Sequence, residues 1–174
     1  MRRIFFLWLM VVSCFTVLGQ ELSTEETALY EIIIEYRAQK KLPAIELSAS
    51  LTTVARAHVE DLAAHPPKGR CNLHSWSKSE RWSRCCYTDG PKSYKCMWDK
   101  PRELTTYTGD GYEIAYWNGG GAGASDALAG WKKSKGHNTV IINKGIWKEV
   151  QWQAIGIAIY GEYAVVWFGK EQDL

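Results

Sequence analysis

The sequence predicts an α+β fold, a three-layer α/β/α sandwich in which helices cover both faces of a central, mainly antiparallel sheet. Two stretches near the N-terminus carry apolar residues at helical spacing, whereas residues 155–168 alternate as strands do. In those strands isoleucines occupy one face and small residues the other. A sheet with two apolar faces needs a layer on each side, so helices are expected above and below it.

The N-terminus predicts export. Arg2 and Arg3 precede an apolar stretch, residues 4–12, that is short for a membrane span and has the length of a secretory signal core. The protein is therefore expected to be secreted or to lie in the cell envelope, and in a bacterium to be periplasmic or lipid-anchored.

Two kinds of processing fit this N-terminus equally. Val17 and Gly19 suit cleavage before Gln20, which makes residues 1–19 a signal peptide. The residues ending at Cys14 also resemble a lipoprotein box, and a lipid on Cys14 would then be the only contact with the membrane. An uncleaved anchor is a third alternative, disfavoured because no second apolar segment of spanning length follows.

The charge balance argues against nucleic acid as a partner. The chain has 21 Lys and Arg and 19 Asp and Glu, so loss of Arg2 and Arg3 leaves no net charge. Because no basic run or stripe is visible, phosphate backbones have no electrostatic footprint to bind. Residues 20–174 have the length of a single domain with one core, which is expected to be a monomer.

Four cysteines follow the signal and predict a disulfide framework, as is usual in an exported chain: Cys71, Cys85, Cys86 and Cys96. Zinc coordination is the alternative. Neighbouring cysteines bond each other only across a distorted peptide, so the Cys85 to Cys86 pairing is disfavoured. Either Cys71 pairs with Cys85 and Cys86 with Cys96, or Cys71 pairs with Cys86 and Cys85 with Cys96.

Two helices are predicted before the cysteines. Ser23 and Glu26 form a capping box for a first helix that runs to about Lys40. Ser48 or Ser50 caps a second helix that ends near His65. One face of this second helix is apolar apart from a histidine, with Leu51, Val54, Ala55, His58 and Leu62.

The middle of the chain, about residues 66–108, shows no periodicity and predicts a long loop stapled by the disulfides. A strand is then expected from Tyr112 to Trp117. Glycines follow it and lead to Ser125 as the cap of a third helix that ends near Ser134. Residues 155–168 form a hairpin whose turn lies at residues 161–162.

Three short motifs occur in a fixed order. They are CNLHSW from Cys71 to Trp76, GYEIA from Gly111 to Ala115, and a tryptophan, Trp131, that leads through Ser134 to Gly136 and His137. This order resembles the CAP family of cysteine-rich secretory, antigen 5 and pathogenesis-related proteins, in its bacterial form. The likeness covers about residues 25–169 and implies the α/β/α sandwich, with residues 81–108 as an insertion of this lineage.

By position, the resemblance implies that His74 and His137 are the two histidines of the family cavity and that Glu113 is one of its glutamates. Members with the full set carry a second glutamate three residues after the tryptophan, where this chain has Ser134 after Trp131. The second acid is therefore missing. Its place can be assigned to none of the acidic residues nearby, which are Glu103, Asp110 and Asp126.

Two imidazoles from distant parts of the chain can bind Zn²⁺ or another divalent metal. We expect His74 and His137 to be the ligands, with Glu113 orienting a histidine or a bound water. Two protein ligands bind a metal weakly, so the ion should exchange. In the alternative interpretation both histidines are structural and satisfy buried hydrogen bonds around Glu113.

The expected function is that of a binding or effector module for an extracellular ligand. The resemblance implies a lipid, a cell-surface component or a protein, and a shared fold does not choose among them. A metal-dependent or Ser/His hydrolase of peptidase type is the alternative, with Ser75 as nucleophile, His137 as base and Glu113 as its orienting group. Because no Gly-x-Ser-x-Gly elbow occurs, the sequence does not favour an enzyme.

The remaining aromatic and histidine residues are expected outside the site. His58 lies on the apolar face of the second helix and is predicted to be in the core, whereas His65 precedes two prolines and is predicted to be exposed. Nine tryptophans predict large buried rings in a loop-rich fold, with an aromatic ligand groove as the alternative.

Overall fold

The computed structural model describes residues 21–88 and 90–174, so the predicted signal peptide, Cys14 and the cleavage site before Gln20 lie outside the described residues. Its elements are α1 (Thr24–Gln39), α2 (Ala49–Ala64), α3 (Pro91–Trp98), α4 (Lys100–Leu104), β1 (Gly111–Trp117), α5 (Ala124–Lys133), α6 (Lys135–Ile141), the 3₁₀ turn η1 (Gly145–Trp147), β2 (Ala154–Tyr160) and β3 (Tyr163–Gly169). Within the described ranges, none of the helices combines the length and hydropathy that a membrane crossing needs.

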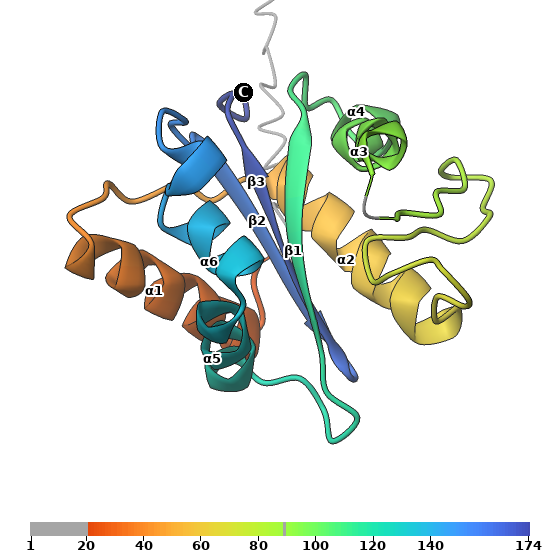
Figure 1. Ribbon diagram of the computed structural model, residues 1–174, viewed down its shortest axis with the longest axis horizontal. Coiled ribbons are helices and arrows are strands. Elements are labelled where there is room, and N and C mark those ends of the chain that lie inside the picture. Colours follow the sequence, from red (N-terminus) through yellow and green to blue (C-terminus); the bar gives the residue numbers. More distant parts are fainter. Residues whose placement is uncertain (1–20, 89) are drawn as a thin grey trace, which may run out of the picture.

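Three antiparallel strands form the sheet in the order β1-β3-β2, so β1 is an edge strand. Figure 1 shows α1, α5 and α6 on one face of this sheet, and α2 with α3 and α4 on the other. Each face has its own core. Ile155 and Ile157 of β2 pack with Leu29 and Ile33 on the α1 side. The predicted fold is thereby confirmed.

The close approach of α2 to the sheet depends on the small residues of β2. Ala154 and Ala158 belong to the α2 core, and Gly156 lies between them. A Cβ placed on Gly156 would lie 2.1 Å from the backbone carbon of Leu51. The helix backbone therefore rests directly on the strand, as the small face of the predicted hairpin indicated.

Side chains at the predicted caps begin the first two helices. Ser23 Oγ accepts the Glu26 amide while Glu26 accepts the Ser23 amide, which confirms the capping box of α1. At α2 the cap is Ser48, whose Oγ accepts the Leu51 amide at 2.8 Å. The other candidate, Ser50, instead donates its amide to Asp173.

The cap predicted for the third helix is wrong. Gly123 is the N-cap of α5, and Ser125 lies inside the helix. The Ala124 amide at this end donates to Glu25 Oε2 of α1 at 3.2 Å, so a carboxylate from another helix supplies the acceptor that a serine cap would supply. The predicted end of this helix near Ser134 is confirmed, and α6 follows it directly.

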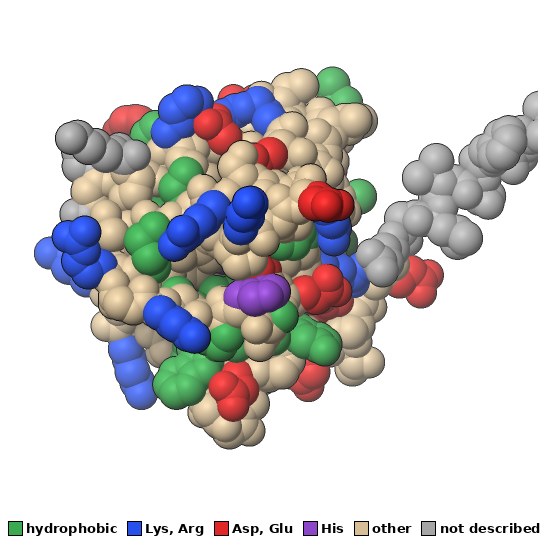
Figure 2. All heavy atoms as spheres, turned by 90° about the vertical axis from the view of Figure 1, so that its right-hand side faces the viewer, with side chains coloured by type: hydrophobic (Ala, Val, Ile, Leu, Met, Phe, Trp, Pro, Cys, Tyr) green, Lys and Arg blue, Asp and Glu red, His purple; other side chains and the backbone are tan. Residues whose placement is uncertain are grey.

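The prediction of a long loop over residues 66–108 is also wrong in part, because α3 and α4 lie within it. These helices have 8 and 5 residues, too few to show an apolar repeat in the sequence. This segment contributes to the face in Figure 2, where Lys and Arg side chains are spread over the surface.

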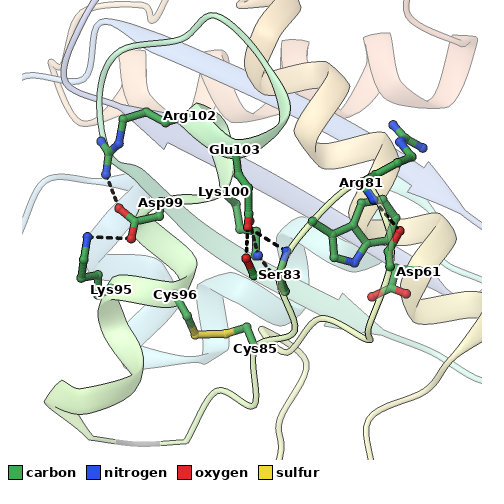
Figure 3. A network of polar contacts seen from close by, with 12 residues as sticks. Asp61, Arg81, Ser83, Cys85, Lys95, Cys96, Asp99, Lys100, Arg102 and Glu103 are labelled. Atoms are coloured by element: carbon green, nitrogen blue, oxygen red, sulfur yellow. Dashed lines mark hydrogen bonds and ion pairs between the residues drawn. A yellow bond between two sulfur atoms is a disulfide. The ribbon is translucent and has the colours of Figure 1, made fainter.

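The segment is held together by disulfides and ion pairs (Figure 3). Cys71 bonds to Cys86 and Cys85 to Cys96, so the second of the two predicted pairings is the one formed. Lys100, which is almost fully buried, donates to the Ser83 carbonyl at 2.6 Å and pairs with Glu103. These contacts fasten α3 and α4 to the loop that precedes them.

Candidate functional site

Glu113 of the edge strand β1 is the centre of the site. Its side chain is fully buried, although β1 is otherwise apolar over most of its length. Neighbouring residues on β1 point to opposite faces, which directs Ile114 into the α1 core and Glu113 toward the layer that contains α2. A buried carboxylate must find partners in that layer.

Two histidines hold the Glu113 carboxylate, one at each oxygen. His74, in the loop after α2, places Nδ1 2.7 Å from Oε1. His58 of α2 places Nδ1 in hydrogen-bond contact with Oε2. The carboxylate therefore bridges an imidazole from a helix and one from a loop.

His58 is a site residue, although its sequence position predicts only a place in the core. It is fully buried, as predicted, and stacks on Trp76 with ring centroids 4.2 Å apart. Its Nε2 lies 3.0 Å from the Ser75 carbonyl, which can only accept. Both ring nitrogens of His58 therefore lie against oxygen acceptors, one of them the buried carboxylate of Glu113.

The electrostatics of Glu113 agree with this geometry. Burial by itself would raise the pKa of the carboxyl, but the charge and hydrogen bond of His58, together with those of His74, outweigh it and hold the pKa below its usual value. Glu113 is thus a carboxylate at neutral pH. It acts as an acceptor for both histidines.

A turn positions His74 at the edge of the pocket. The His74 amide donates to Asn72 Oδ1 at 3.0 Å, and the Ser75 amide donates to the Asn72 carbonyl at 3.0 Å. With Nδ1 bound to Glu113, the nitrogen that His74 can offer to a ligand is Nε2. This nitrogen has no hydrogen-bond partner among the described residues, and the side chain is 15% exposed.

His137 comes from the opposite helical layer. It lies on α6, and its ring centroid is 6.2 Å from that of His74, with the two planes at 76°. Burial, assisted by the nearby His74, lowers the pKa of His137 to about 4, although Glu113 acts in the other direction. His137 is therefore a neutral imidazole at pH 7, with a lone pair available.

The site offers few donors to a metal. His74 and His137 can each offer one nitrogen, whereas both oxygens of Glu113 are bound to histidines. Across residues 21–88 and 90–174, no group of three or more His, Cys, Asp or Glu side chains has the arrangement of a metal site. A metal here would have two protein ligands and take its other ligands from solvent.

The residues that could replace the missing acid or act as a nucleophile have other partners than the site histidines. Ser75 Oγ accepts the Tyr87 amide at 2.9 Å, and no contact joins this oxygen to a histidine ring in the described structure. Ser134 sits between α5 and α6, where its carbonyl accepts the Asn138 amide. Glu103 pairs with Lys100, and Asp110 pairs with Arg102.

An aromatic pocket of about 250 Å³ adjoins the site. Its lining consists of His74, Tyr87, Tyr94, Met97, Trp98, Tyr112, Glu113, Val140, Ile146 and Trp147. The rings follow one another at centroid distances of 5.2 to 6.0 Å, from His74 through Tyr87, Tyr94, Trp98 and Tyr112 to Trp147. Ile146 is 88% exposed beside it.

This pocket crosses the edge of the sheet. Tyr112 and Glu113 are consecutive on β1 and point to opposite faces, yet both line it. The insertion supplies one wall through α3, and α6 with η1 supplies another. The sequence singled out His74, Glu113 and His137, whereas the aromatic wall has no signal in sequence beyond an excess of tryptophan.

One sequence signal could have drawn attention to His58. It is the single histidine on an apolar helix face, and Glu113 is the single acid on an apolar strand. Buried polar groups need partners, but the sequence does not say that these two side chains meet. His65, by contrast, is exposed as predicted, with its side chain 64% accessible.

Comparisons with known proteins agree on the fold. The model of the cysteine-rich secretory protein family, CAP, matches residues 30–165. An outer surface protein of Borrelia burgdorferi superposes with a TM-score of 0.58 at 19% identity, over 89% of this chain and 100% of that one. A search of curated protein sequences gives no significant match.

Two further solved structures are similar. An extracellular protein of Bacillus anthracis that contains a SCP domain has a TM-score of 0.58 at 15% identity, over 84% of this chain and 40% of that one. A cysteine-rich secretory protein of Staphylococcus aureus has a TM-score of 0.54 at 14% identity, over 84% and 39%. This chain therefore spans about two fifths of these two proteins.

Proposed function

The chain belongs to the cysteine-rich secretory protein (CAP) family, and from this premise we propose that it is an exported binding domain. Its ligand site is the aromatic pocket beside His74 and His137. The observation that carries the proposal is the clamping of Glu113 by His58 and His74, which leaves one nitrogen of His74 and the neutral His137 without hydrogen-bond partners among the described residues. Fixed side chains with unsatisfied nitrogens beside an apolar pocket support the proposal, because a recognition site works best when its groups are preorganised.

Export is supported by three independent features. An apolar stretch with two arginines before it begins the chain. Two disulfides join Cys71 to Cys86 and Cys85 to Cys96, and such bonds persist in oxidising compartments. The similar structures include an outer surface protein and an extracellular protein. We place the domain outside the cytoplasm, secreted or in the cell envelope.

The pocket favours a small apolar group with one polar end. About 250 Å³ is below the usual range for drug-sized ligands, roughly 300 to 1,000 Å³, and suits one ring or a short chain. The rings of Tyr94, Trp98 and Trp147 would contact the apolar part. The polar end would reach His74 or His137, directly or through a metal. A lipid, a cell-surface component and a protein side chain can all present such a group.

A divalent metal such as Zn²⁺ would be held by Nε2 of His74 and by His137. Glu113 accepts the hydrogen of His74 Nδ1, which sets the tautomer and increases the basicity of the ligating nitrogen. A bound metal would supply Lewis acidity toward a ligand oxygen. With two protein ligands the affinity should be low and the metal exchangeable.

Zinc titration by calorimetry tests the metal part of the proposal. We expect one weak site in the protein, lost in His137→Ala because one of the two ligands is removed. His65→Ala is the matched control, since His65 is exposed and contacts Asp61 rather than Glu113, and it should bind zinc like the unmodified protein. Equal zinc binding by both variants, or none by the unmodified protein, would contradict the metal site.

The same variants separate binding from hydrolysis. A binding domain shows no turnover of peptide or ester substrates with or without zinc, whereas the alternative hydrolase would show turnover that His137→Ala abolishes. Zinc-dependent turnover would replace the proposed function with that alternative.

A further inference from the structure

A second pocket, separate from the aromatic one, lies between the C-terminal end of α2 and the disulfide loop. Its volume is about 410 Å³, and it shares no lining residue with the aromatic pocket. Lys68, Lys78 and Arg84 bring three positive charges to it, and Pro66 and Pro67 contribute apolar surface. The proposed function makes no use of this pocket.

The net positive charge of this region does not appear in the net charge of the whole chain. Residues 66–84 carry a single acidic residue, Glu80, against five basic ones, namely Lys68, Arg70, Lys78, Arg81 and Arg84. The chain after residue 19 has no net charge, so acidic residues elsewhere offset this excess. The left and centre of Figure 2 show Lys and Arg side chains with apolar ones between them. Basic residues that form no continuous run in the sequence therefore still gather in one region of the surface.

The three cations of the pocket are not neutralised by their surroundings. In the described structure no Asp or Glu forms an ion pair with Lys68, Lys78 or Arg84. The buried Asp61 nearby is committed to Ser77, whose amide donates to it at 2.7 Å and whose hydroxyl also contacts it. The charges of the pocket are thus available to a ligand.

The backbone around the cations is fixed. Trp76 and Cys85 exchange two backbone hydrogen bonds, at 2.8 and 3.1 Å, which sets Lys78 and Arg84 on the two strands of one narrow loop. The Cys71–Cys86 bond closes the same loop, and Cys71, Cys85 and Cys86 all line the pocket. A ligand would meet cations whose attachment points are already in place, which lowers the entropy lost on binding.

We propose that this pocket binds a phosphate or sulfate ester. A guanidinium and two ammonium groups match a tetrahedral oxyanion that carries one or two negative charges. The apolar surface between the cations would contact the carbon skeleton that bears the ester. A phosphorylated or sulfated glycan and a phospholipid headgroup share this chemistry, and the size of the pocket lies in the range of small-molecule sites.

Calorimetry with inorganic pyrophosphate and sedimentation with vesicles test the proposal. The variant combines Lys68→Gln, Lys78→Gln and Arg84→Gln. The matched control removes the same charge elsewhere, through Lys133→Gln, Lys144→Gln and Lys148→Gln. We expect the pocket variant to lose about tenfold or more in affinity and the control to change by less than about twofold. Binding should also weaken as salt is added, because these charges are exposed.

The vesicle arm identifies the source of the ester. Vesicles of phosphatidylcholine with phosphatidylglycerol are compared with vesicles of phosphatidylcholine alone. If the protein sediments with the anionic vesicles but does not bind pyrophosphate, the ligand is a lipid headgroup. If it binds pyrophosphate but not the vesicles, the ligand is a soluble or glycan ester. In either case the pocket variant must lose the observed binding. Equal losses in both triple variants would show a general charge effect and overturn the proposal, as would failure of the unmodified protein to bind either probe.

Discussion

Single residues of the site have environments that differ from those expected of their secondary-structure elements. Glu113 lies on a strand and His58 on an apolar helix face, yet they form a fully buried pair. Such a pair contributes little net stability while both partners are present, but loss of one leaves an uncompensated buried charge. His137 is the opposite case, because the folded protein keeps it neutral.

The pH dependence of stability should report this neutrality of His137. Its pKa falls from 6.5 in the unfolded chain to about 4 in the folded protein, so between these values the unfolded chain binds more protons. The free energy of unfolding should therefore decrease as the pH falls from 6.5 to 4. Glu113, whose pKa is lowered from 4.5, adds to the loss at the acid end of this window.

Urea unfolding at a series of pH values measures this slope. His137→Gln should show a shallower decrease between pH 6.5 and 4 than the unmodified protein, whereas His65→Gln, at an exposed position, should not. Equal slopes in the two variants would mean that His137 is as accessible to protons in the folded protein as in the unfolded chain.

At the scale of elements, the contact of α2 with β2 determines where His58 lies. Ala154, Gly156 and Ala158 present a flat surface, and the helix backbone at Leu51 rests against it. His58 is two turns further along α2, so the same contact brings its ring to Glu113. The small face of the hairpin thus has a role in the site as well as in packing.

Gly156→Ala should destabilise the protein by about 1 to 3 kcal/mol, because the new methyl group would meet the backbone of Leu51 and Thr52, and a helix backbone cannot move aside as a side chain can. Urea denaturation measures the change. Gly136→Ala is the matched control in α6, where a Cβ meets nothing within 4 Å. The control should be neutral or more stable by up to about 1 kcal/mol. Equal stability of both variants would contradict the close packing.

At the scale of the whole molecule, the aromatic pocket exists because two layers meet at the free edge of β1. The insertion reaches this edge from one side and α6 with η1 from the other. An exposed edge strand is a liability for aggregation, and cover by helices is one way in which proteins protect it. Here the cover also encloses the pocket, and the Cys85–Cys96 bond joins α3 to the rest of the insertion.

Removal of this bond by Cys85→Ser with Cys96→Ser should cost about 3 kcal/mol of stability, the value expected for a short closed loop. Because α3 supplies Tyr94 and Trp98 to the pocket, binding of an apolar probe such as N-phenylnaphthylamine should weaken as well. Urea denaturation and probe fluorescence measure the two effects. A variant with unchanged midpoint and unchanged fluorescence would show that the bond neither stabilises the insertion nor shapes the pocket.

The amino-acid sequence determined what depends on neighbours along the chain: the capping box of α1, the alternation of the hairpin, the disfavouring of a Cys85–Cys86 bond, and the motifs that carry His74, Glu113 and His137. Tertiary structure alone decided which cysteines pair, and that Glu25 rather than Ser125 accepts an amide hydrogen at the start of α5. It also decided that His58, 55 residues from Glu113 in the chain, is the partner of that carboxylate. Caps and periodicity are short-range properties of the backbone. Partners of buried charges and the walls of pockets depend on how whole layers come together around an edge strand.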